Sequence, residues 1–137
     1  MTPDELEQFL RDAFPANPPP LKVEAITEAG VLLRRTVSSA EERPGGTVSG
    51  PALMGLADTA AWLSVLSRIG LVALAVTTSL HIDFLRKPAL VDVFADGRVL
   101  KLGSRLAVVD VSMWSADGSP DELVAKAQVT YSIPPRR

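Results

Sequence analysis

Hydrophobic and polar positions alternate most regularly near the end of the chain. The odd-numbered positions from 123 to 133 are hydrophobic, and the even-numbered positions from 126 to 132 are polar. A period of two is typical of a strand with one buried face. Three earlier segments also predict strands, and two Gly-containing turns join the later strands into an antiparallel meander: strands 73–85, 91–100 and 107–115, turns 101–104 and 116–119.

The first third of the chain predicts a helix and a hairpin. Thr2-Pro3-Asp4-Glu5 is a capping box with proline at the first helical position, and apolar residues at helical spacing extend the helix to about Phe14. The proline-rich segment 15–20 then forms a loop. Residues 21–37 predict two strands around a turn at 28–30, and 43–46 reads as a further loop.

A second helix is predicted over 51–68, with Ser49 as its N-cap and Pro51 in its first turn. This segment is apolar nearly all round and contains many small residues, so we expect neighbours to approach it closely on several sides. The chain length suits one domain over residues 1–137. The elements together predict an α+β fold in which one antiparallel sheet wraps around one long central helix.

Asp58 is the only charged residue between Val48 and Ser67. Burying an unpaired carboxylate costs several kcal/mol or more, so this side chain must find a partner, shift its pKa or face a polar cavity. Asp58 is therefore the first functional candidate. A hydrogen-bonded carboxylate with a purely structural role is the alternative interpretation.

The composition limits the classes of partner that we expect for this protein. The net charge is -2, with 14 basic and 16 acidic side chains, which provides no basic field for nucleic acid or anionic membranes. There is no cysteine and one histidine, so we expect no disulfide, no metal site and no cofactor. The first residues lack the features of a secretory signal, and charged residues interrupt the apolar stretch 52–80; we expect a cytoplasmic protein without a membrane span.

The order of elements resembles the hotdog fold, and two motifs resemble the PaaI-like acyl-CoA thioesterases. That family has an Asn-x-x-Gly-x-x-His-Gly-Gly loop leading into a helix with Leu-Ala-Asp. The matching segments here are Arg43-Pro44-Gly45-Gly46-Thr47-Val48-Ser49-Gly50-Pro51 and, without a gap, Leu56-Ala57-Asp58. Segment 77–89 is similar to the family's long strand, which ends in a basic residue and proline.

The resemblance implies hydrolysis of an acyl-CoA thioester, with CoA as part of the substrate, in a homodimer or a dimer of dimers. The backbone N–H of Gly50 would polarise the thioester carbonyl. Asp58 would act as general base or nucleophile, facing Gly50 of the other subunit. Thr77 aligns with a polar residue that helps to place the water. An uncovered sheet edge and apolar face favour oligomerisation independently.

Two positions differ from the family pattern. Arg43 and Ser49 stand where the family has Asn and His. Arg43 could pair with Asp58 across the interface or bind a ligand carboxylate or phosphate. Ser49 could serve only as the helix N-cap. The basic residues that could hold CoA phosphates, or be solvated strand-end charges, are Arg86, Lys87 and Arg105.

Two other functions remain open. The first is a non-catalytic acyl-CoA-binding or CoA-binding protein of the same fold. The second is a hydratase or dehydratase, which in hotdog relatives uses an acid with a nearby histidine; here the only histidine is His81, on a predicted strand. Trp62 and Met54 suit either the core or an acyl-pocket wall. Replacing Asp58 with Asn distinguishes an enzyme from a binder.

Overall fold

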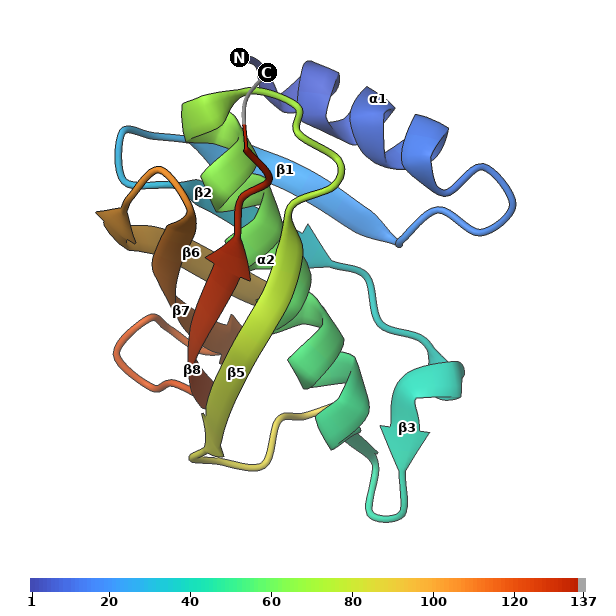
Figure 1. Cartoon of the computed structure of the whole chain (residues 1–137). Helices are drawn as coiled ribbons and strands as arrows, with labels where there is room; N and C mark the ends of the chain where they lie inside the picture. Colours follow the sequence, from blue (N-terminus) through green and yellow to red (C-terminus); the bar gives the residue numbers. More distant parts are fainter. Residues whose placement is uncertain (136–137) are drawn as a thin grey trace.

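The structure, a computed structural model, describes residues 1–135. A six-stranded antiparallel sheet curves around a long helix, α2 (Gly50–Ile69), as Figure 1 shows. This arrangement confirms the predicted hotdog fold. Along the sheet the strands follow the order β1 (Leu21–Ile26), β2 (Val31–Arg35), β6 (Val93–Leu102), β7 (Leu106–Ser115), β8 (Ala125–Ser132) and β5 (Val76–Phe84).

The predicted meander is correct only for β6, β7 and β8. β5 pairs with β8 at the edge of the sheet, and β6 pairs with β2 on its other side. Expecting β5 beside β6 was wrong because residues 85–92 do not close a hairpin: this connection crosses from the edge to the middle of the sheet. A tight turn at Gly103 does join β6 to β7, and the N–H of Gly103 donates a hydrogen bond to the carbonyl of Leu106.

The core lies between α2 and the inner face of the sheet. The predicted period of two is confirmed on β8, where Ala125, Ala127, Val129 and Tyr131 are buried and the residues between them are not. α2 comes so near to β6 that a Cβ at Gly97 would collide with the hydroxyl of Ser64. Small residues on α2 and on β6 therefore set the distance between the helix and the sheet.

α1 (Pro3–Ala13) matches the predicted helix and begins at Thr2, whose Oγ1 accepts a hydrogen bond from the N–H of Glu5. Its buried residues are Leu6 and Leu10, and the helix lies against β1 (Figure 1). None of the helices in the described part of the chain has the length and apolarity needed to cross a bilayer.

A short structured segment precedes α2. A 3-10 turn, η1 (Ser39–Glu41), leads into a two-stranded hairpin of β3 (Glu42–Arg43) and β4 (Thr47–Val48). The segment 43–46, which the sequence predicted as a loop, thus contains the last residue of β3 and the turn of this hairpin. The ion pair of Arg35 with Glu41, 2.8 Å long, lowers the pKa of Glu41 and ties η1 to the sheet.

Candidate active site

The Asp58 carboxylate is held by two hydroxyl groups. Its Oδ1 accepts hydrogen bonds from Thr77 Oγ1 and from Tyr131 Oη, each 2.6 Å long. Within residues 1–135 no cation pairs with Asp58, and no hydrogen bond reaches its Oδ2. The carboxylate has found the expected partners, and one oxygen stays available to another group.

Strand register brings the two hydroxyls together. Thr77 on β5 is the direct partner of Tyr131 on β8, and a bulge between Thr77 and Ser79 shifts the register beyond this pair. Residues directly opposite in an antiparallel pair project from the same face, so both side chains reach Asp58. Sequence reasoning missed Tyr131. The available signal was its predicted burial, because a buried tyrosine hydroxyl usually has a hydrogen-bond partner.

Tyr131 stays protonated in this environment. Its side chain is buried, and burial raises the pKa of its phenol well above the ordinary value; the hydrogen bond to Asp58 raises the pKa further. An ionised phenolate beside the Asp58 carboxylate would place two like charges together. At neutral pH the hydroxyl is therefore a hydrogen-bond donor.

This pKa predicts a loss of stability at alkaline pH. Because the folded state keeps the phenol protonated, the stabilisation is complete below the unfolded pKa of about 10 and falls by about 1.4 kcal/mol per pH unit above it, until the folded pKa is reached. The chain has one tyrosine, so tyrosinate absorbance reports Tyr131 alone. We expect the absorbance to rise together with unfolding. Ionisation near pH 10 with the fold intact would contradict this prediction.

The N-terminus of α2 offers one free backbone donor at Gly50. Ser49 is confirmed as the N-cap: its Oγ accepts from the N–H of Ala52 at 3.3 Å, and its carbonyl accepts from the N–H of Leu53. Pro51 has no N–H. The N–H of Gly50 has no partner among the described residues. This donor lies where the helix dipole favours negative charge.

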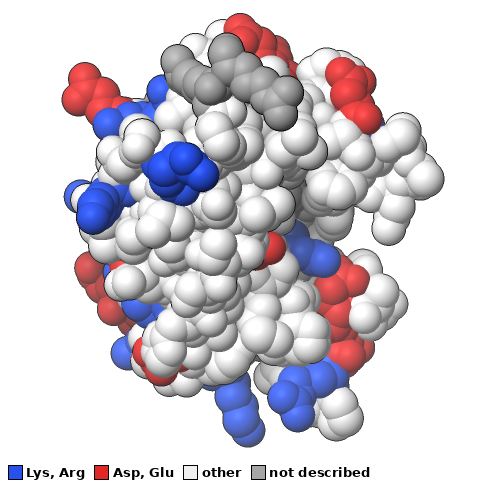
Figure 2. Space-filling model, viewed as in Figure 1, with Lys and Arg blue, Asp and Glu red and all other residues white. Residues whose placement is uncertain are grey.

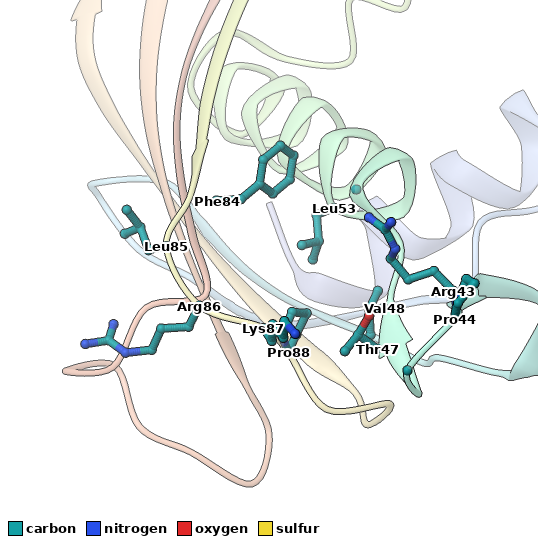
Figure 3. A pocket seen from close by; sticks show the side chains of 12 residues that line it. Arg43, Pro44, Thr47, Val48, Leu53, Phe84, Leu85, Arg86, Lys87 and Pro88 are labelled. Carbon is teal, nitrogen blue, oxygen red and sulfur yellow. The ribbon is translucent and has the colours of Figure 1, made fainter.

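A cavity of about 570 Å³ opens beside Gly50. Three of its lining side chains are cationic and none is acidic: Arg43, Arg86 and Lys87. Figure 3 shows Arg43 extending toward the first turn of α2, whereas Arg86 points away from the cavity. There Arg86 donates to the carbonyl of Leu123 at 2.8 Å. Arg43 makes no ion pair within residues 1–135. The cavity thus suits an anionic or polarised ligand.

A second cavity, about 340 Å³, lies beside Asp58. Asp58, Thr77 and Tyr131 give it polar groups, and most of its other lining residues are apolar, among them Phe14 and Trp62. The Trp62 ring packs against Phe14 and against Phe9 of α1, with centroids 6.2 and 5.3 Å apart. Trp62 is therefore both core and cavity wall, and this cavity can hold an apolar group next to the carboxylate.

Other candidates lie elsewhere in the protomer. Arg105 borders a separate cavity with Ile69 and Val72, so the structure does not group it with Arg86 and Lys87. His81 is exposed on β5, with its ring nitrogen 3.1 Å from the Asp83 carboxylate and away from Asp58. Within the protomer, Asp58 therefore lacks the nearby histidine that a hydratase of this fold would use. Met54 is 38% exposed on α2, so it is not a core residue of the single protomer.

The comparisons with known proteins agree on one family. The sequence model of the thioesterase superfamily matches residues 45–122. A solved structure of a proposed thioesterase from Silicibacter sp. TM1040 is 39% identical, with a TM-score of 0.88; the match covers 98% of this chain and 93% of that one. No curated protein matches the sequence significantly.

Two further solved structures are similar. A variant of the phenylacetic acid degradation protein PaaI from Thermus thermophilus is 25% identical, with a TM-score of 0.71 and coverage of 90% of this chain and 97% of that one. Zebrafish thioesterase superfamily member 2 is 20% identical, with a TM-score of 0.83 and coverage of 98% and 99%; at this identity the likeness concerns the fold alone.

Proposed function

Because the chain belongs to the thioesterase superfamily, we propose that it hydrolyses an acyl-CoA thioester to a free acid and CoA, using Asp58 of one subunit and the backbone N–H of Gly50 of the partner subunit. The observation that carries this proposal is the N–H of Gly50 at the start of α2, which has no partner within residues 1–135, together with the Oδ2 of Asp58, which accepts no hydrogen bond from the same residues. The two groups supply an oxyanion donor and a general base.

The chemistry uses these groups in sequence. Asp58 accepts a proton from a water molecule as the water oxygen attacks the carbonyl carbon. The N–H of Gly50 stabilises the negative charge that develops on the carbonyl oxygen, and the α2 dipole adds to this stabilisation. The C–S bond then breaks, the CoA sulfur takes up the proton that Asp58 accepted, and the acid leaves. Thr77 holds the carboxylate that activates the water.

A single protomer does not bring these groups together. Gly50 and Asp58 are eight residues apart on α2, about 12 Å along the helix axis and about 80° around it. A base and an oxyanion donor must each lie within about 3 Å of the reacting atoms. The site we propose therefore needs two copies of α2.

The exposed strand β5 supports a homodimer. Within residues 1–135, β5 pairs on one side only, with β8, and most of its nine residues are exposed. The molecular face around β5 is largely uncharged (Figure 2). An unpaired edge strand that carries few charges is a template for pairing with another strand. A dimer of dimers remains compatible with this arrangement.

Self-pairing of β5 would complete the site. Thr77, near one end of β5, contacts Asp58; Phe84, at the other end, lies beside Gly50, since a Cβ there would be 3.6 Å from its ring. Antiparallel pairing about a two-fold axis at His81 would place Thr77 opposite Leu85 of the partner subunit, next to Phe84 of the partner subunit. Asp58 would then face the partner's Gly50.

The same two-fold pairing predicts a cross-link. The chain has no cysteine, so a single His81→Cys variant presents one thiol per subunit. Opposite residues near the two-fold axis lie about 4.5–5.5 Å apart, within disulfide range. We expect oxidation to yield a covalent dimer on a non-reducing gel. Lys101→Cys, exposed on β6 and away from this edge, is the control that should stay uncross-linked. A monomer in solution would contradict the shared site.

The cavities suggest how the substrate binds. The cationic cavity beside Gly50, with Arg43 and Lys87, suits the phosphates of CoA. Arg105 lines a different cavity, so it could contact CoA only outside this one. The largely apolar cavity beside Asp58 suits the acyl group. The acyl group would then lie against Phe14 and Trp62.

Release of CoA from short, medium, long and aromatic acyl-CoAs by the purified protein tests the proposed function. Turnover on at least one thioester is expected, and the preferred chain defines the acyl class. Saturable CoA binding without turnover on any thioester would favour the binding protein instead, with Arg43 and Ser49 as the first residues to revert toward the family pattern.

A further inference from the structure

Tyr131 contacts the proposed base directly. It is 4% exposed on β8, and its Oη lies 2.6 Å from Asp58 Oδ1 and 3.1 Å from the backbone carbonyl oxygen of Asp58. Building on the proposed function, we propose that Tyr131 is a positioning residue: its hydroxyl holds the Asp58 carboxylate in the orientation from which it activates water.

The carboxylate needs such a restraint. The terminal torsion of an aspartate is broad and roughly two-fold, so an unrestrained carboxylate samples many orientations. Tyr131 and Thr77 donate to the same oxygen, Oδ1, from adjacent strands. Fixing Oδ1 also fixes Oδ2, which then has one direction in which to accept a proton. Precise placement of catalytic groups requires this kind of supporting hydrogen bond.

The hydroxyl of Tyr131 differs from the side chains beside it on β8. The other inward-facing residues of β8 have no polar side-chain atom: Ala125, Ala127 and Val129. The single hydroxyl on this face lies at the level of Asp58 and contacts both its side chain and its backbone. It joins β8 to α2 at the proposed site. Because burial raises the pKa of Tyr131, the phenol acts as a donor and does not supply a proton to the departing sulfur.

Tyr131→Phe removes the hydroxyl and keeps the ring. Losing a hydrogen bond to a charged catalytic group is expected to lower kcat about ten- to a hundredfold. We expect that fall in kcat with KM changed by less than about threefold, since Tyr131 acts on the base and not on CoA. Val111→Ala, in the core of β7, is the control that loses packing without losing turnover per folded molecule.

A second measurement separates positioning from a structural defect. In the Asp58→Asn background, adding Tyr131→Phe should lower kcat no further, because the residue acts through Asp58. A structural defect would lower kcat again. The single tyrosine also allows 3-fluorotyrosine to label position 131 alone. We expect its fluorine resonance to shift with Asp58→Asn and to stay with Val111→Ala.

The outcomes distinguish this inference from the function on which it rests. Wild-type kcat in Tyr131→Phe, with Asp58→Asn inactive, would overturn the positioning role and leave the thioesterase intact. An unmoved fluorine resonance in Asp58→Asn would overturn it too, even where Tyr131→Phe fails to fold. Full turnover by Asp58→Asn would overturn the assignment of Asp58 as the base, on which this inference rests, and no turnover by the wild type on any thioester would overturn the proposed function itself.

Discussion

Asp58→Asn is expected to lower kcat about a thousandfold, because removing a general base costs about 10²–10⁴ in rate. The amide has nearly the same shape, and its oxygen still accepts from Thr77 and Tyr131. It cannot take the proton of the attacking water. The measurement is CoA release from the best acyl-CoA, together with CoA affinity, which should persist.

Asp117→Asn is the matched control for this change. Asp117 is also an aspartate, but it is exposed in the turn between β7 and β8 and is not part of β5. A surface substitution of this kind should leave kcat within about twofold. If both variants kept full turnover, Asp58 would not be the base.

Gly50→Pro is expected to lower kcat about a hundred- to a thousandfold, the usual cost of removing one oxyanion donor. Proline deletes the N–H and suits the first helical position, and the extended ψ of Ser49, 151°, tolerates a following proline. Gly50→Ala is the control. Its Cβ meets Phe84 at ordinary contact distance and its N–H remains, so its loss should stay within about tenfold.

Mixing the two inactive variants tests the shared site directly. Asp58→Asn and Gly50→Pro protomers, unfolded and refolded together, should form heterodimers in which one of two sites combines an intact Asp58 with an intact Gly50. Random pairing would restore about a quarter of wild-type turnover. If both groups worked within one subunit, no turnover would return, and the proposal of a site across the interface would be wrong.

Several elements followed from local pattern. α1 begins at its capping box, α2 begins after Ser49, and β8 alternates as its sequence does. Such features depend on residues within a few positions of one another. The resemblance added the fold family and pointed to Asp58 and Gly50. The position of β5 was missed because strand order depends on contacts between residues far apart in the sequence, and local patterns do not report such contacts.

The sequence by itself determined where the helices and most strands lie, that Asp58 stands alone in an apolar segment, and that Ser49 caps the second helix, because periodicity, capping and charge are properties of neighbouring residues. Only the tertiary structure decided that Tyr131 and Thr77 share one oxygen of Asp58, and that β5 lies free at the edge. Those facts depend on the register between β5 and β8 and on the approach of α2 to both. Residues more than 50 positions apart meet there, and their meeting is set by packing of the whole core.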